Sequence, residues 1–307
     1  MPALEAEAAG AEAPDVELHG WRDDDGPLAA LAAALSGVRG RVGIEKPHLS
    51  VAWYELARSV APAAEWVDGA AVVGDLRLVK DDDELAAMRR AAAIVDRALA
   101  RLVEELRPGR TEADLAARAG QLIRDEGADG VAFEPIVAAG AKSALPHGNP
   151  DSTPVVEGDL VVVDMGAKVA GYCSDLTRTL VAGREPDARQ RELFDVVREA
   201  QATGVRAAVA GATGADVDRA ARSVIEAAGL GESFVHRTGH GLGLEVHEPP
   251  SLHSANLEPL LAGTVVTVEP GVYLPGYGGV RIEDDVVVRS GEPEVLTQAP
   301  IALEQSR

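Results

Sequence analysis

The sequence contains a single cysteine, has no long apolar run, and has no basic segment at its N-terminus. One cysteine, Cys173, excludes an internal disulfide and is typical of a reducing compartment. No apolar run approaches the roughly 18–20 residues that a membrane helix needs, and a secretory signal opens with basic residues. We therefore expect a cytoplasmic protein that does not associate with membranes.

Basic side chains are also scarce. Lysine and arginine together number 29, only four of them lysine, against 50 acidic residues, so the formal net charge is −21. Nucleic-acid binding needs clustered basic side chains to neutralise phosphates, so this balance excludes nucleic acid as an expected partner. It favours metal ions, or peptides with a free ammonium group. Apolar residues at 46% and charged residues at 26% are ordinary for a globular protein.

Three segments are predicted along the chain. Residues 1–14 are rich in alanine and glutamate and are expected to form a flexible tail. Residues 15–77 are expected to form a short N-terminal α/β domain, and residues 78–307 the main domain. The elements expected in the short domain are helices over 27–35 and 51–59 and strands over 41–44 and 66–67. The main domain should open with a long helix from an aspartate cap at 81–83 to about residue 106.

An internal repeat follows that helix. Residues 109–127 (GRTEADLAARAGQLIRDEG) align without gaps on residues 211–229 (GATGADVDRAARSVIEAAG), with identities that include Thr111/Thr213 and Asp114/Asp216. Each copy follows a long helical pattern and precedes strand-like sequence, which predicts a duplicated fold with two related halves. Two unrelated alanine-rich helices with similar caps are the alternative interpretation.

The first acidic pair lies in a predicted hairpin formed by residues 160–165 and 172–181. Asp164 and Asp175 are equidistant from the midpoint between Val169 and Ala170. A symmetric hairpin would place them opposite each other, with their Cβ atoms roughly 4.5–5.5 Å apart. Desolvated like charges repel, so this arrangement needs a neutralising group.

A second predicted hairpin, residues 264–268 and 280–288, repeats this pattern. Glu269 and Glu283 are each seven residues from Gly276, so they too are expected to be cross-strand neighbours. Four carboxylates from two hairpins would form an anionic pocket that a pair of divalent cations could neutralise. The alternative is that nearby arginines, Arg178 and Arg281, pair with these acids. An oxygen-rich site with one or two imidazoles suits Mn²⁺, Co²⁺ or Zn²⁺.

Four of the seven histidines lie in dense local patterns. His236, His240 and His247 occur in FVHRTGHGLGLEVHEPP, and His147 occurs in SALPHG. The spacing of His236 and His240 would suit a zinc-binding helix, but the surrounding glycines favour a strand or loop that approaches a ligand closely. We expect one histidine to complete a two-metal site and others to contact the substrate.

These motifs together resemble a known family. Asp164 and Asp175 in VVVDMGAKVAGYCSDLTRT, His240 in TGHGLGLEVHEPP, Glu269 in VVTVEPGVY and Glu283 in GVRIEDDVVV are similar, in this order, to the metallopeptidases that include aminopeptidase P, prolidase and methionine aminopeptidase, family M24. The resemblance covers roughly residues 78–303. It implies the α+β pita-bread fold with a duplicated catalytic domain. The N-terminal domain of the Xaa-Pro-cleaving branch is usually about twice as long as the segment found here.

The resemblance also implies roles for individual residues. Asp164 would chelate one metal, His240 and Glu269 the other, with Asp175 and Glu283 bridging both. His247 would stabilise the oxyanion, Glu269 would also move a proton, and the remaining candidates for contact with the substrate are His147, His236 and Arg281. Mn²⁺ is the first expectation for both metals, ahead of Co²⁺ or Zn²⁺.

The phrases VRIED and GHGLGLEVHE resemble the Xaa-Pro-cleaving branch most closely. The expected activity is removal of an N-terminal residue that precedes proline in short peptides, by an Xaa-Pro aminopeptidase or dipeptidase that could form a homodimer. Two alternatives are a non-catalytic pita-bread binding protein and a methionine aminopeptidase-like enzyme. The native metal, and the preference for dipeptides or longer peptides, stay open.

Overall fold

The computed structural model describes residues 1–304 in two compact units, and each is described by itself. The first unit is Met1–Leu76, and the second begins at Arg77, next to the boundary that the sequence predicts after residue 77. In the described part of the chain, no helix is both long and apolar enough to cross a membrane.

The first unit is built around a two-stranded parallel sheet. Strand β1 (Gly40–Ile44) pairs with β2 (Ala64–Asp68), and helix α3 (Val51–Val60) connects them. The hydroxyl of Ser50 caps α3 by accepting from the backbone N–H of Trp53 at 3.3 Å. The remaining elements of this unit are η1 (Ala3–Glu5), α1 (Ala6–Glu12), α2 (Leu28–Ala34) and the first turns of α4 (Ala70–Leu78).

Residues 1–14, for which the composition predicts a flexible tail, contain η1 and α1, and no residue of either helix is buried. Pro2 forms a β-bridge with Trp21, and the N-terminal ammonium group donates to the carbonyl of His19 at 3.1 Å. The predicted helices and strands of this unit are present at α2, β1, α3 and β2, whereas α4 was not expected.

The second unit contains two halves of similar order. The first half consists of two helices followed by short strands and the hairpin that carries Asp164 and Asp175; its elements are α5 (Asp82–Glu105), α6 (Glu112–Asp125), β3 (Gly130–Val131), β4 (Ile136–Ala139), η2 (Gly140–Ala144), β5 (Leu160–Met165), β6 (Ala167–Val169), β7 (Tyr172–Cys173) and β8 (Leu176–Val181). Helix α5 begins with a capping box in which the Asp81 carboxylate accepts from the N–H of Glu84 and the Glu84 side chain accepts from the N–H of Asp81.

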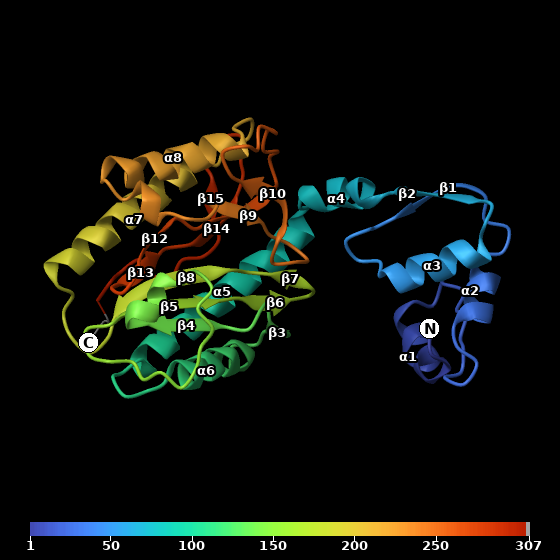
Figure 1. Ribbon diagram of the computed structural model, residues 1–307, viewed down its shortest axis with the longest axis horizontal. Helices are drawn as coiled ribbons and strands as arrows, with labels where there is room; N and C mark the ends of the chain where they lie inside the picture. The colour runs from blue at the N-terminus through green and yellow to red at the C-terminus, as the bar shows by residue number, and fades with distance from the viewer. Residues whose placement is uncertain (305–307) are drawn as a thin grey trace. The chain divides into compact units, whose positions relative to one another are not determined.

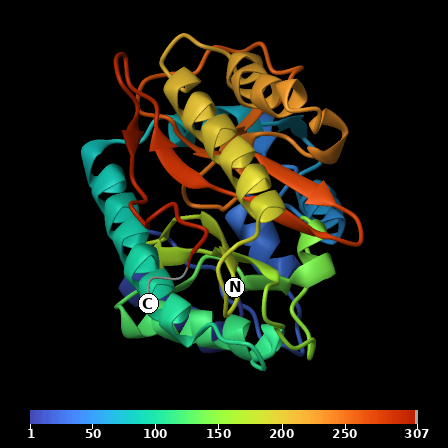
Figure 2. The same cartoon turned by 90° about the vertical axis from the view of Figure 1, so that its left-hand side faces the viewer.

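The second half repeats this order of two helices followed by strands. Its elements are α7 (Ala188–Ala207), α8 (Gly214–Ala227), η3 (Gly231–Ser233), β9 (Gly239–Gly241), β10 (Glu248–Leu252), β11 (Val265–Val268), β12 (Gly271–Leu274), β13 (Gly278–Arg281), β14 (Asp284–Val287) and β15 (Glu294–Val295). Figure 1 shows the pairs α5/α6 and α7/α8 on opposite sides of the strands. In Figure 2, α7 (yellow) crosses the strands of its own half (red), against which its apolar face packs.

Matching hydrogen bonds confirm that the sequence repeat is a structural one. Thr111 and Thr213 cap α6 and α8 by accepting from the N–H groups of Asp114 and Asp216, each at 3.1 Å. Both threonines also form an antiparallel bridge to a proline of a later loop. Two unrelated alanine-rich helices would not share these tertiary partners, so the chain is duplicated.

The first hairpin has a different centre from the one predicted. Asp164 pairs with Thr177, not with Asp175, because the turn is formed by Ala170 and Gly171, both with positive φ (50° and 87°). The centre of the hairpin therefore lies one residue later than predicted, and each residue pairs with a residue two positions beyond its predicted partner. Asp175 lies in the break between β7 and β8, where its backbone N–H donates to the Asp285 carboxylate at 3.1 Å.

The second hairpin has the predicted centre. Strands β12 and β13 pair Gly271 with Arg281, and β11 and β14 continue the same register with Val268 opposite Asp284. Glu269 and Glu283 fall between these two ladders, opposite each other. The expectation that they are cross-strand neighbours is therefore confirmed.

A close backbone approach at β9 generates a prediction about stability. A Cβ atom on Gly239 would lie 1.9 Å from the carbonyl oxygen of Thr267 on β11, whereas a Cβ on Gly130 would meet nothing within 4 Å. We expect Gly239→Ala to destabilise the protein by about 3 kcal/mol, roughly 6–12 °C in Tm, because backbone must move to relieve the overlap. Thermal melting followed by circular dichroism tests this. Gly130→Ala is the matched control, and equal melting temperatures for the two variants would contradict the packing argument.

Candidate metal centre

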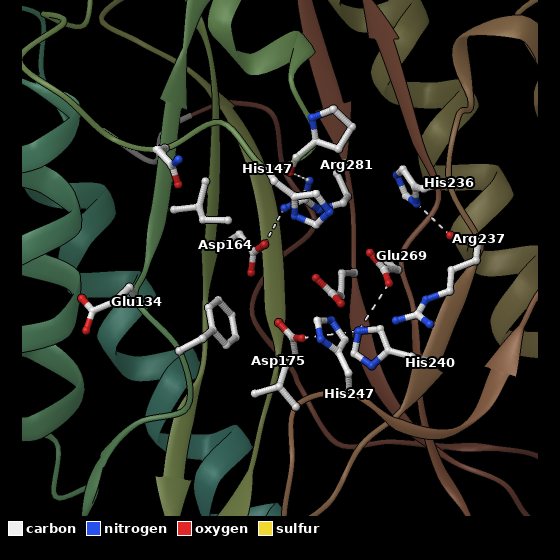
Figure 3. A pocket seen from close by; sticks show the side chains of 16 residues that line it. Glu134, His147, Asp164, Asp175, His236, Arg237, His240, His247, Glu269 and Arg281 are labelled. Atoms are coloured by element: carbon white, nitrogen blue, oxygen red, sulfur yellow. Dashed lines mark hydrogen bonds and ion pairs between the residues drawn. The ribbon is translucent and has the colours of Figure 1, made fainter. Parts of the chain in front are cut away.

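All nine residues that the sequence singles out as site candidates line one cavity of about 710 Å³ in the second unit (Figure 3). The four carboxylates and His240 lie at its floor, and three further histidines and an arginine surround them. The nine residues are His147, Asp164, Asp175, His236, His240, His247, Glu269, Arg281 and Glu283.

Both halves of the duplicated fold contribute to this floor. Asp164 and Asp175 come from the β5–β8 hairpin, and Glu269, Glu283 and His240 come from β11–β14 and β9. Figure 3 shows the two aspartates on one side, facing Glu269 and His240 on the other. The two hairpins are joined where the N–H of Glu283 donates to the carbonyl of Thr177 at 3.1 Å. This junction brings together acids that are 94 to 119 residues apart in the chain.

His240 lies among the carboxylates. Its Nε2 atom is 3.4 Å from Oε1 of Glu269 and 3.8 Å from Oδ2 of Asp175. Asp175, His240 and Glu283 each present one donor atom, and these atoms all lie within 4.8 Å of one another. All three residues are buried. Such spacing would allow one cation to contact all three residues.

The charge state of His240 suits this role. Its Nδ1 atom faces the carbonyl of Gly241 at 3.1 Å, a contact that places the ring proton on Nδ1 and leaves the Nε2 lone pair toward the carboxylates. Burial lowers the pKa of His240 to about 3. The imidazole is therefore neutral near pH 7, as a metal ligand must be.

The pKa values of three of the carboxyl groups are shifted upward, whereas that of His240 is lowered. Burial, reinforced by the other carboxylates, raises the pKa of Asp175 and of Glu283 well above its ordinary value. Burial also raises the pKa of Glu269 to about 7, although Arg281 opposes the shift. Without a cation, the site favours protonated carboxyl groups.

The arginines neutralise only part of this charge. Arg281 donates to Oδ2 of Asp164 at 2.5 Å, so the alternative interpretation holds for that one acid. Arg178 instead pairs with Asp284 at 2.7 Å, behind the site. Within residues 1–304, no lysine or arginine forms a salt bridge with Asp175, Glu269 or Glu283.

The remaining donors fit divalent cations. Oδ1 of Asp164 and Oδ1 of Asp175 are buried and have no hydrogen-bond partner among the described residues. Buried oxygens are normally paired, and coordination to a cation is one way to satisfy them. Hard carboxylate oxygens with one neutral imidazole form the donor set that Mn²⁺, Co²⁺ and Zn²⁺ accept.

Sequence reasoning missed several polar residues of the site, among them Glu134 and Asn149, which line the cavity. Tyr273 accepts from Arg281 at 3.2 Å and lies 2.8 Å from Nε2 of His236, so it connects a predicted arginine to a predicted histidine. Thr177 donates to Glu283 at 2.5 Å and accepts from Arg281 at 3.0 Å. Arg237 lines the cavity directly beside His236. Tyr273 and Thr177 lie in the quoted motifs, but a tyrosine or threonine on a strand carries no signal of its own.

A cavity floored by carboxylates and an imidazole, in a duplicated α+β fold, defines the class of metal-dependent hydrolases with a pita-bread fold. Residues 86–290 match metallopeptidase family M24, and residues 1–79 match the creatinase/prolidase N-terminal domain. The chain therefore belongs to metallopeptidase family M24 and is a metallopeptidase, as its resemblance predicts. Membership in this family implies divalent metal ions as cofactors.

Two solved structures and one curated relative illustrate the similarity. A prolidase from Thermococcus sibiricus superposes with a TM-score of 0.93 at 38% identity, covering 99% of this chain and 83% of that one. An X-Pro aminopeptidase from Thermotoga maritima gives 0.91 at 36% identity, covering 99% and 84%. A Xaa-Pro dipeptidase of Pyrococcus furiosus is 42% identical over 227 residues, which is 74% of this chain and 65% of the dipeptidase.

The raised carboxyl pKa values generate a prediction about pH. A carboxyl group whose pKa is raised on folding contributes stability that is present below its ordinary pKa and is lost as the pH rises through its folded-state value. The metal-free protein should therefore lose stability between about pH 5 and 8, as the pH passes the pKa of about 7 of Glu269, and the raised pKa of Glu283 adds to this loss. Added Mn²⁺ should restore it.

We expect the increase in Tm on addition of Mn²⁺ to grow with pH and to reach about 8–16 °C near pH 8 at a thousandfold excess over Kd. Differential scanning fluorimetry of the chelated protein, with and without Mn²⁺, measures this. Asp175→Asn should abolish the increase because it replaces a charged carboxylate within the site by a neutral amide. A metal-induced increase that is the same at pH 5 and pH 8 would show that the carboxyl groups are not the ligands.

Proposed function

We propose that the protein hydrolyses the peptide bond between an N-terminal residue and a following proline in short peptides, using two divalent cations, with Mn²⁺ as the first candidate. The observation that supports this most strongly is the buried set of four carboxylates and His240, in which donors remain unpaired. The similarity to two proteins named prolidase and Xaa-Pro dipeptidase, and to one named X-Pro aminopeptidase, supports the substrate class.

The proposed ligand assignment follows the positions of the donors. Asp164 would hold one cation, and His240 with Glu269 would hold the other. Asp175 and Glu283, one from each hairpin, would contact both cations, because each offers a donor atom within 4.8 Å of the other and of His240. When bound, such cations lower the pKa of water and polarise a carbonyl group.

The residues around this set would orient the peptide and move the proton. Glu269, which lines the cavity with Oε1 3.4 Å from Nε2 of His240, can accept a proton from water and deliver it to the departing prolyl nitrogen. His247, which lines the cavity beside His240, would donate toward the oxygen on which negative charge develops. A peptide bond to proline is a tertiary amide and has no N–H to donate. A site that selects its substrate by shape does not depend on such a donor.

His147, His236 and Arg281 would seat the substrate. His236 is already held by Tyr273 and by the carbonyl of Arg237, and burial lowers its pKa to about 4, so its ring is neutral near pH 7. Arg281 is held by Asp164, Thr177 and the carbonyl of Pro146. Both side chains are therefore fixed before a peptide binds, which reduces the entropy cost of binding.

A cytoplasmic site of action is part of this proposal, because the single cysteine is a buried free thiol whose pKa burial raises to about 11. A thiol of this kind suits a reducing compartment but does not require one.

Activity after removal and return of metal tests the proposed function. The protein is dialysed against a chelator, supplied with Mn²⁺, Co²⁺ or Zn²⁺ singly, and assayed on Ala-Pro, Ala-Pro-Ala and Met-Ala-Ser. We expect metal-dependent cleavage of at least one proline peptide and little cleavage of Met-Ala-Ser. The ratio of the first two substrates distinguishes a dipeptidase from an aminopeptidase.

Each contrary outcome identifies an alternative. Preferential cleavage of Met-Ala-Ser would indicate a methionine aminopeptidase-like enzyme. Absence of cleavage together with absence of bound metal by elemental analysis would indicate a non-catalytic binding protein. Cleavage that survives complete removal of metal would contradict the role of the carboxylate set.

A further inference from the structure

Two of the cavity histidines lack the anchoring that the other two have. The rings of His236 and His240 both have hydrogen-bond partners. His147 and His247 are exposed to the cavity, and neither ring has a hydrogen bond to any of residues 1–304. His247 contacts the ring of His240 edge-on, with centroids 4.3 Å apart. The loops that carry His147 and His247 must therefore set where these two rings lie.

The loop that carries His147 is fastened at both ends by one buried carboxylate. Glu112, which has no exposed surface, accepts from the N–H of Ala139 at 2.8 Å and from the N–H of Asp151 at 3.3 Å. The ammonium group of Lys142, inside the loop, donates to the same carboxylate at 2.6 Å. Glu112 thus joins the start, the middle and the end of the loop.

The loop that carries His247 is fastened by a second pair of the same kind. Glu248 follows His247 directly, and its carboxylate accepts from Lys80 at 2.6 Å and from Arg77 at 2.7 Å. The side chains of Lys80 and Glu248 are only 2% and 4% exposed. A Cβ atom on Gly243 would lie 2.5 Å from the Glu248 carboxylate, so the loop folds directly against it.

Stability alone does not account for these two pairs. Removing two opposite charges from water costs about as much as their attraction returns, so apolar side chains of similar volume often stabilise a fold as well. A buried carboxylate does hold its donors in one geometry, because a displaced loop breaks charge-assisted hydrogen bonds to Glu112 or Glu248 that water cannot readily replace in the interior. A displacement of about 1 Å in a catalytic group can reduce a rate by two orders of magnitude.

We propose that Glu112–Lys142 and Lys80–Glu248 are positioning pairs, each of which holds one loop so that His147 and His247, respectively, face the substrate. None of the four residues is among those that line the cavity. The inference rests on the proposed peptidase function only for its kinetic consequences, since the contacts that fasten the loops exist without substrate.

The two pairs have different expected kinetic consequences. Breaking the Lys80–Glu248 pair should lower kcat about ten- to hundredfold with little change in KM, since His247 acts where charge develops. Breaking the Glu112–Lys142 pair should mainly raise KM, by about tenfold, since His147 seats the peptide. Each variant is therefore the matched control for the other.

Double mutants separate positioning from general damage. Glu112→Gln and Glu248→Gln are each made alone and combined with His147→Ala or His247→Ala, and kcat, KM and bound metal are measured on the proline peptide that the parent protein cleaves best. Glu248→Gln should have no further effect on kcat in the His247→Ala protein and its full effect in the His147→Ala protein. The converse should hold for Glu112→Gln and KM. The proposal would be overturned if Glu112→Gln or Glu248→Gln reduced activity by the same factor in the His147→Ala protein and in the His247→Ala protein. Loss of bound metal in either glutamine variant would also overturn it.

Hydrogen exchange tests the same inference without activity. In the metal-free protein, Glu248→Gln should accelerate amide exchange over residues 243–247 and leave 140–151 unchanged, and Glu112→Gln should do the reverse. Uniform acceleration would overturn the proposal. If the parent protein cleaves neither proline peptide, the proposed function fails while this measurement still decides whether each pair holds its loop.

A charge-neutral variant covers the case in which a single substitution prevents folding. Lys80→Met/Glu248→Leu replaces the pair with apolar side chains, and Arg77, which loses Glu248, keeps its ion pair with Glu245 at 3.0 Å. We expect it to fold and still to show faster exchange over residues 243–247. Normal exchange there would show that packing alone positions the loop and would overturn the proposal.

Discussion

Mutual repulsion among buried carboxylates is the constraint on which the rest of this structure depends. Asp164, Asp175, Glu269 and Glu283 share one cavity, and burial already raises the pKa of three of them. A cluster of carboxylates that repel one another does not by itself stabilise the fold. The surrounding hydrogen bonds, from Arg281 to Asp164 and from Thr177 to Glu283, relieve part of the repulsion and leave the remainder for cations.

The duplicated architecture explains how the acids are brought so close together. Each half offers a hairpin whose strands are buried and apolar up to the point where a carboxylate appears, as in Leu160–Met165 and Val265–Val268. Apolar packing of these strands against the helix pairs provides the stabilisation that offsets the repulsion. The acidic residues extend over the whole chain, but the fold gathers four of them into one cavity.

The accuracy of the sequence predictions varied with the kind of information each one needed. The Glu269–Glu283 pairing could be predicted because Gly276 marks the centre of a symmetric hairpin. The Asp164–Asp175 pairing was wrong because the left-handed conformation of Ala170 is uncommon for alanine and leaves no trace in the sequence. Helix α4 was missed because Val72, Val73 and Gly74 have low helix propensity.

The most useful unpredicted features are contacts between distant parts of the chain. Nothing local links Tyr273 to His236, or Lys80 to Glu248, because 37 and 168 residues separate the partners. Tyr273 is hydrogen-bonded to His236, and Glu248 follows His247 directly in the chain; the motifs identified both histidines. The motifs therefore identified residues that line the cavity, whereas the contacts that hold those residues could be seen only in the tertiary structure.

The division of the carboxylates between two hairpins has a consequence for fragments of the protein. Residues up to the end of β8 carry two of the acids, and residues from the start of α7 carry the other two with His240. The connection between them, residues 182–187, is partly exposed. A chain cut there would yield two pieces, each with an incomplete set of donors, so tight cation binding would report the reassociation of the two halves.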